Sequence, residues 1–281
     1  MQSSYEKNIS YYDKNALRYE CSSWYFFNKY KDRTLQDELG RCVQFIGKHH
    51  ISVLEIGPGT GYLLSKLLNM TGITISYTGI EHSSAMKSIL EQRYSSKLND
   101  INVIHASVTA EYIDRHLAGR HFDLIIGSSI LHHLPDYDAV VEKLAKLLDF
   151  RGVMYFVREP IHKSECLQAR IHQEFFNCIY EAINSILMKP LIKNYFWPQK
   201  KKQEDAKEIA IHMFKDGVSI KVFSALCNNG FKLVIFRKYN RRVSSFFSFF
   251  ENSWLKWTRK DIFGNTLFAI GVQKPQMPQR M

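Results

Sequence analysis

Short apolar runs alternate with helical stretches between residues 51 and 157, and this alternation constrains the fold more than any other feature of the chain. Five runs rich in β-branched and apolar residues have the length of buried strands: 51–56, 73–81, 101–107, 122–129 and 153–159. The stretches between them place apolar residues at helical spacing. Strands that alternate with helices predict right-handed βαβ units. We therefore expect an α/β protein with a doubly wound, mostly parallel sheet and helices on both faces.

The first predicted strand runs into a glycine-rich loop, VLEIGPGTG, at residues 53–61, whose glycines are Gly57, Gly59 and Gly61. A dinucleotide fingerprint needs its third glycine at position 62, where this chain has Tyr62. A P-loop needs Lys followed by Ser or Thr after its last glycine, and the chain does not have them. Neither phosphate-binding template fits, although the loop ends a strand at the sheet edge where open α/β folds bind ligands.

Two acidic residues indicate what the loop would hold instead. Glu55 precedes the first glycine by two positions, so we expect its carboxylate to face the loop, where it would repel a phosphate and attract a cation. Glu81 ends the second predicted strand, where an acid accepts hydrogen bonds from both hydroxyls of a ribose. A nucleoside with a cationic group and no phosphate describes S-adenosylmethionine.

Several motifs of the chain resemble those of the class I S-adenosylmethionine-dependent methyltransferases. The glycine loop resembles their first motif, YTGIEHS (77–83) their second, and FDLIIGSSILHHLPD (122–136) their fourth-strand motif, followed by LLDFRGVMYFVREP (147–160). The resemblance covers about residues 45–160. It implies a Rossmann-like sheet of seven strands with one antiparallel strand near the edge, S-adenosyl-L-methionine as the cofactor, and S-adenosyl-L-homocysteine as the product.

The resemblance also implies which residues contact the cofactor: the glycine loop, the ends of the second, third and fourth strands, and a Tyr-rich N-terminal segment. The predicted cofactor-binding residues are Glu55, Gly57, Gly59, Gly61, Glu81, His82, Ala106, Ser107, Ser128, His132, Tyr11 and Tyr19. Many relatives carry Asp at the end of the third strand where this chain has Ala106-Ser107. The alternative for Tyr11 and Tyr19 is surface packing.

Catalysis of methyl transfer needs an aligned nucleophile and, for a hydroxyl acceptor, a base that takes its proton. His132 and His133 follow the fourth predicted strand, and Glu159 ends the fifth at the same edge. We predict His133 and Glu159 as the catalytic residues, with a plain helix-start role as the alternative for the histidines. His162 and His172 are weaker candidates, and we expect no metal site because no cluster has ligand spacing.

The predicted organisation has four parts. Residues 1–45 form an N-terminal helical lid, 46–160 the cofactor-binding core, and 161–215 an inserted helical substrate cap. Residues 216–281 complete the core with a helix and the last two strands, which flank an aromatic and basic insertion. That insertion, SSFFSFFENSWLKW, would pack on the domain, contact a membrane face or stack on RNA bases.

Charge is divided unevenly along the chain. Residues 1–150 hold 16 Lys and Arg against 17 Asp and Glu, whereas residues 151–281 hold 22 against 10. The basic part would meet an anionic substrate, a membrane surface or nucleic acid, or would only keep the protein soluble. Five scattered cysteines and an N-terminus without an apolar run lead us to expect a cytoplasmic protein.

The function predicted from these features is methyl transfer to an oxygen or nitrogen atom of a small molecule, with a natural product, a sugar or a lipid-linked intermediate as the expected acceptor classes. An anionic acceptor fits the charge, a peripheral membrane contact is compatible with the basic part, and nucleic acid is not the expected partner. The alternatives are an RNA methyltransferase and a non-catalytic module that binds S-adenosylmethionine or a protein partner.

Overall fold

The computed structural model describes residues 4–19, 29–98, 100–134, 136–165, 217–239 and 267–275. The chain divides into two compact units. Unit 1 comprises residues 1–159, 220–236 and 269–281, and unit 2 comprises residues 160–219 and 237–268. The predicted aromatic insertion and His172 lie outside the described residues.

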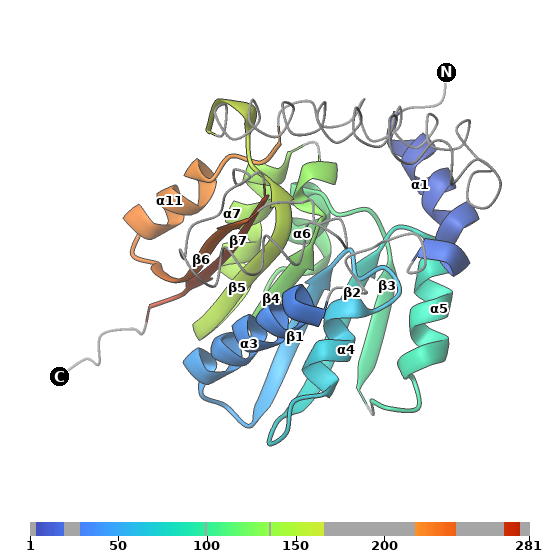
Figure 1. Cartoon of the computed structure of the whole chain (residues 1–281), viewed down its shortest axis with the longest axis horizontal. Helices are drawn as coiled ribbons and strands as arrows, with labels where there is room; N and C mark the ends of the chain where they lie inside the picture. Colours follow the sequence, from blue (N-terminus) through green and yellow to red (C-terminus); the bar gives the residue numbers. More distant parts are fainter. Residues whose placement is uncertain are drawn as a thin grey trace, which may run out of the picture. The chain divides into compact units, whose positions relative to one another are not determined.

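Seven strands form one sheet in the order β3-β2-β1-β4-β5-β7-β6 (Figure 1). Their bounds are β1 His50–Ile56, β2 Thr74–Glu81, β3 Ile101–His105, β4 Phe122–Ser128, β5 Leu148–Pro160, β6 Lys232–Tyr239 and β7 Leu267–Gln273. The neighbours from β3 to β5 pair in parallel. The backbone N–H of Lys274 donates to Gly152 O at 2.9 Å, so the carboxyl end of β7 lies beside the start of β5 and the two strands run in opposite directions. The predicted seven-stranded, mostly parallel sheet is confirmed.

Helices cover both faces of this sheet. Their bounds are α1 Ser4–Asn15, α3 Lys29–Ile46, α4 Tyr62–Leu68, α5 Ser84–Tyr94, α6 Ala110–His116, α7 Tyr137–Leu147 and α11 Lys221–Asn228. Short 3₁₀ helices lie at Ala16–Arg18, Leu131–His133 and Lys163–Glu165. Figure 1 shows α3 and α4 in front of the sheet and α6 and α7 behind it, and α7 also contacts α11.

The core forms because the central strands are apolar on both faces, as expected for a parallel sheet between two helix layers. In β4 every residue from Phe122 to Gly127 is buried. The helix α7 turns one apolar side to the sheet, and its buried residues are Val140, Val141, Leu144, Ala145 and Leu147. This packing fixes the strand ends at one edge, where the glycine loop follows β1.

Two predicted boundaries were wrong. The third strand ends at His105, so Ala106 and Ser107 lie in the loop that follows it. The fifth strand begins at Leu148, immediately after α7, because Leu148 is buried and pairs with Phe122. The register then shifts before Leu124 pairs with Val153, so the Arg151-Gly152 turn is an irregularity inside the strand.

In unit 2, residues 160–162 lie beside residues 217–219. Ile161 and Val218 form a parallel bridge, the N–H of Val218 donates to Pro160 O at 2.8 Å, and that of His162 donates to Val218 O at 2.9 Å. The two ends of the predicted substrate cap, whose interior lies outside the described residues, are therefore joined by backbone hydrogen bonds.

Candidate functional site

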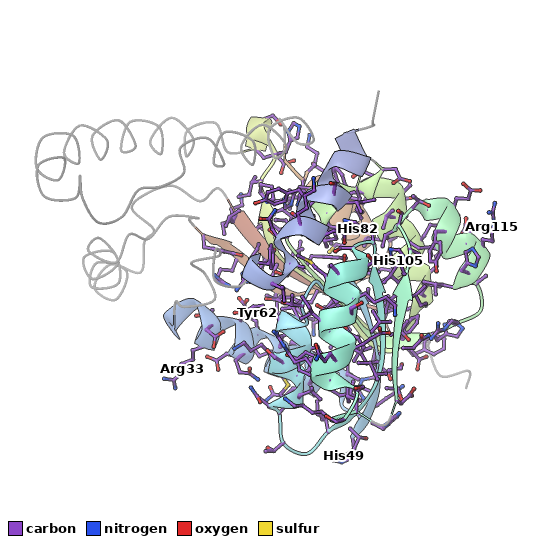
Figure 2. All side chains as sticks on the ribbon, turned by 90° about the vertical axis from the view of Figure 1, so that its right-hand side faces the viewer. Arg33, His49, Tyr62, His82, His105 and Arg115 are labelled. Carbon is purple, nitrogen blue, oxygen red and sulfur yellow. The ribbon has the colours of Figure 1, made fainter. Side chains whose placement is uncertain are left out.

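Two adjoining pockets lie at the carboxyl edge of the parallel strands. Figure 2 shows His82, which follows β2, at the opposite end of the molecule from His49, which precedes β1. One pocket, called the apolar pocket below, is lined by Gly57, Ile80, His82, Val108, Ile130, His133 and Leu134. The second, called the charged pocket, is lined by Tyr19, Glu55, Gly57, Pro58, Gly59, Thr60, Tyr62, Leu63, Ser128 and Arg158. Gly57 borders both pockets, so they form two ends of one cleft.

The glycine loop makes room for this cleft. Gly57 has φ +62°, and a Cβ added to it would lie 2.6 Å from Ile130 Cδ1. A Cβ at Gly61 would lie 2.5 Å from a ring atom of Tyr94, so this glycine allows the close packing of α5 and is not among the pocket-lining residues. Gly57 therefore determines the shape of the cleft, while Gly61 serves the packing behind it.

Glu81 braces the loop from the end of β2. Its side chain is buried, with one carboxylate oxygen accepting from Gly59 N–H and the other from Ser83 N–H, both at 2.8 Å. A carboxylate oxygen has two lone pairs, so each oxygen retains acceptor capacity beyond its backbone partner. Ser83 in turn caps α5 by accepting from Met86 N–H at 3.2 Å. The acid thus couples the glycine loop to the start of α5.

Glu55 lies beneath the loop and is 2% exposed. Burial raises its pKa to about 8; the hydrogen bond from the Tyr77 hydroxyl, 2.8 Å long, lowers the pKa, and the nearby Glu81 raises it. The carboxyl therefore holds its proton at neutral pH. A cation in the charged pocket would favour the ionised form of the carboxyl.

Helix α1 is fixed over the apolar pocket by Asp13. The Asp13 carboxylate accepts from Ser83 Oγ at 2.6 Å and from Ala85 N–H at 3.2 Å, at the N-terminus of α5. A carboxylate there is favoured by the exposed N–H groups and the dipole of the helix. This contact places the next residue along α1, Tyr12, against the two histidines of the pocket.

Tyr12 contacts both histidines edge-on. Its ring centroid lies 6.0 Å from that of His133 and 6.1 Å from that of His82, and its hydroxyl lies 3.3 Å from His133 Nε2. Burial, followed by the neighbouring imidazoles of His132 and His82, holds the pKa of His133 well below its usual value. A neutral His133 suits a wall of the apolar pocket and is a weak base.

The adjacent histidine is held differently. Glu159 is 0% exposed, and its carboxylate accepts from the backbone N–H groups of Ile130, Leu131 and His132 at 2.8, 3.1 and 3.3 Å. Its Oε2 also lies 2.8 Å from His132 Nδ1. With this many donors on one buried carboxylate, Glu159 orients His132 and its loop and does not face a substrate. A ring nitrogen held by a carboxylate is the arrangement that prepares the other nitrogen for proton transfer.

Arg158 brings a cation to the charged pocket. Its side chain is 9% exposed, its guanidinium carbon lies 4.5 Å from the centre of the Tyr62 ring, and its Nη2 donates to the Tyr62 hydroxyl at 2.9 Å. Tyr62 donates to Asp32 Oδ1 at 2.7 Å, and Lys66 lies 2.6 Å from the same oxygen. Burial raises the pKa of Tyr62 to about 12, so its phenol is neutral at pH 7.

The structure brings most of the predicted residues to this cleft. Those that line it are Tyr19, Glu55, Gly57, Gly59, His82, Ser128 and His133. Glu81, His132 and Glu159 support its walls through the hydrogen bonds described above. The Ala106 N–H donates to Glu81 O at 3.1 Å, Ser107 follows it in the loop, and the Tyr11 ring packs edge-on against Tyr12, with ring centres 5.6 Å apart.

Three contributors were missed at the level of sequence: Tyr12, Tyr62 and Arg158. Tyr12 adjoins the predicted Tyr11, and only the rotation of α1 separates them. Arg158 adjoins the predicted Glu159, where the strand pattern favoured the acid.

Within the described residues, no group of three His, Cys, Asp or Glu side chains could hold a metal ion. The same part of the chain contains no helix with the length and apolar character needed to cross a membrane.

Comparison with known proteins places residues 54–154 in a family described as a methyltransferase domain. A non-reducing polyketide synthase of Aspergillus terreus is 30% identical over 129 residues, which cover 44% of this chain and 5% of the synthase. An uncharacterized methyltransferase of Bacillus subtilis is 27% identical over 150 residues, covering 53% of this chain and 64% of that protein. The chain thus spans less than two thirds of each of these relatives.

Among solved structures, a protein described as a sarcosine dimethylglycine methyltransferase from Galdieria sulphuraria superposes with a TM-score of 0.51. It is 14% identical, and the match covers 87% of this chain and 85% of that protein. At this identity the likeness concerns the fold, and it agrees with the strand order found here. By its matched domain and its fold, the chain carries the domain of the class I, Rossmann-like S-adenosylmethionine-dependent methyltransferases.

Proposed function

We propose that the chain transfers a methyl group from S-adenosyl-L-methionine to a small molecule. The observation that carries the proposal is the cleft at Gly57, which joins an apolar pocket to a charged one and is braced by Glu81. A flat heteroaromatic base suits the first pocket, and the charged amino-acid part of a sulfonium nucleoside suits the second. The methyltransferase domain matched over residues 54–154 supports the same function.

The residues present fit this cofactor. Glu81 lies next to Ile80 of the apolar pocket and retains acceptor capacity for ribose hydroxyls. Glu55 lines the charged pocket and would be stabilised as a carboxylate by a nearby cation. The remaining proposed contacts are Gly57, Gly59, His82, Ser128 and Tyr19 from the cleft, with Gly61, Ala106, Ser107 and Tyr11 behind or beside it.

The bound cofactor supplies an electrophilic methyl group on a sulfonium sulfur, so the protein's task is to align the acceptor and to remove its proton. We assign proton removal to His132. Its Nδ1 is held by the buried Glu159 at 2.8 Å, which would stabilise the imidazolium formed when Nε2 takes a proton. This assignment changes the sequence-based one: His133 becomes a wall of the apolar pocket, and Glu159 becomes the residue that positions the base.

The proposed division of labour follows the predicted parts of the chain. Residues 1–45 would close over the cofactor, 46–160 would hold it, 161–215 would cover the acceptor, and 216–281 would complete the sheet. The Asp13 contact with α5 supports the first of these roles, because it holds α1 beside the apolar pocket.

A transfer assay tests the proposal. Purified protein is incubated with methyl-labelled S-adenosylmethionine and, separately, with the small-molecule and RNA fractions of a cell extract. We expect label in the small-molecule fraction. Label confined to RNA, in a reaction that weakens steeply as salt is raised, would support the RNA alternative. Cofactor binding without transfer to either fraction would support the non-catalytic module.

A further inference from the structure

Arg158 is the charged residue of the cleft that the proposed reaction does not yet use. It lines the charged pocket opposite the glycine loop and is 9% exposed. It also directly precedes Glu159, which holds the proposed base. Its guanidinium is therefore fixed near both the cofactor end and the acceptor end of the site.

The backbone at this point is strained in a way that aims the side chain. Arg158 has φ +65° and Ser129, at the end of the neighbouring strand β4, has φ +57°. Side chains with a Cβ rarely adopt this left-handed conformation, and such outliers cluster at functional sites. The two residues are linked, since Ser129 Oγ donates to Arg158 O at 3.3 Å and Ser129 N–H donates to Val157 O at 2.9 Å.

The contacts of Arg158 orient it without neutralising it locally. Tyr62 supports the flat face of the guanidinium and accepts one hydrogen bond from it, but its phenol is neutral at pH 7. The nearest carboxylate in this network, Asp32, is reached through the Tyr62 hydroxyl and is itself paired with Lys66 at 2.6 Å. The three ionised groups Asp32, Lys66 and Arg158 sum to one positive charge. A guanidinium has five N–H donors in a planar fork, which suits a carboxylate.

We propose that Arg158, held by Tyr62, binds a carboxylate group at the charged end of the cleft. The inference rests on the proposed function, because the carboxylate belongs either to the amino-acid part of the cofactor or to an acidic methyl acceptor. In both cases Arg158 fixes one end of a reactant beside His132. A charge-assisted pair of this kind contributes roughly ten- to a hundredfold in affinity.

Calorimetry with two cofactor-like probes separates the sources. S-adenosylhomocysteine has the carboxylate, and 5′-methylthioadenosine has the same nucleoside without it. If the cofactor's carboxylate binds Arg158, then Arg158→Met weakens S-adenosylhomocysteine at least tenfold and leaves methylthioadenosine unchanged, with Arg158→Lys in between. Tyr62→Phe should give a smaller loss of the same kind.

If the carboxylate belongs to the acceptor, S-adenosylhomocysteine binds Arg158→Met as it binds the wild type. Protein saturated with that product then binds benzoate but not benzamide, as detected by ligand NMR, and Arg158→Met loses the benzoate signal. Arg120→Met is the matched control, because Arg120 also donates to a hydroxyl, Thr78 Oγ1 at 3.0 Å, and covers a ring, that of Phe122, away from the pocket.

The proposal is overturned if Arg158→Met changes neither S-adenosylhomocysteine nor benzoate binding. It is also overturned if the variant weakens methylthioadenosine as much as S-adenosylhomocysteine, since Arg158 would then serve only the fold. A wild-type protein that binds neither nucleoside would contradict the proposed function itself, which is a separate outcome.

Discussion

The two ends of the cleft differ in what holds a ligand. The apolar pocket has walls of Ile80, Val108, Ile130 and Leu134, and its two histidines lie under Tyr12, so shape dominates there. The charged pocket has Glu55 and Arg158 on its walls, so ionisation dominates there. Substitutions that change shape should therefore act at the first pocket and substitutions that change charge at the second. Gly57, which borders both, should respond to either.

The largest expected effect distinguishes the two adjacent histidines. His132→Asn removes the proposed base and should lower kcat roughly a hundred- to ten-thousandfold while leaving cofactor affinity near the wild-type value. His133→Asn, the matched variant one residue away, should instead weaken cofactor binding, because His133 lines the apolar pocket. Steady-state kinetics with separate calorimetry check the pair, and the reverse pattern would restore His133 as the base.

Gly57→Ala should damage the shape shared by both pockets. The added Cβ would lie 2.6 Å from Ile130 Cδ1 at a positive φ, so we expect a loss of roughly 2–4 kcal/mol in the free energy of unfolding. Gly72→Ala is the control, since Gly72 has φ +81° with nothing within 4 Å of its Cβ position, and should cost about 1 kcal/mol. Equal losses in urea unfolding would show that the close approach to Ile130 is unimportant.

The charged pocket should respond to pH through Glu55. Its pKa is raised to about 8, so below that pH binding of a cationic ligand must first release a proton. Affinity for S-adenosylmethionine should therefore rise with pH between 6 and 8, by up to about tenfold per unit, and level off above 8. The same raised pKa means that the stability of the unliganded protein falls as pH rises from about 4.5 to 8.

Glu55→Gln is the control for this pH dependence, because it keeps the shape of the side chain and removes its ionisation. Calorimetry across the pH range should give a flatter profile for the variant. A wild-type profile already flat between pH 6 and 8 would show that Glu55 is not linked to the bound cation.

The smallest effect is expected at Tyr12. Tyr12→Phe keeps the ring over the two histidines and removes only the 3.3 Å contact with His133 Nε2, so cofactor affinity should fall about two- to fivefold. Tyr11→Phe, on the same helix, should change nothing. A larger loss in Tyr11→Phe would mean that α1 presents Tyr11 to the cofactor, as the sequence pattern predicted.

The sheet could be predicted from the sequence because its central strands are apolar on both faces and are separated by amphipathic helices such as α7. The glycine loop and Glu81 were also predictable, since their chemistry depends on positions at strand ends. The start of β5 was not, because Arg151-Gly152 is typical of a turn between elements and here lies inside the strand. Arg158 and Tyr12 were missed because backbone strain and helix rotation, which no residue pattern records, decide where they point.

The central claim is that the Gly57 cleft binds a sulfonium nucleoside and that Glu81 holds its ribose. Calorimetry of S-adenosylhomocysteine with the folded wild-type protein and with Glu81→Ala tests it most directly. We predict saturable one-to-one binding by the wild type, weakened roughly tenfold or more in the variant, because a carboxylate's hydrogen bonds are lost. No binding to the folded wild-type protein, or an unchanged affinity in Glu81→Ala, would contradict the account.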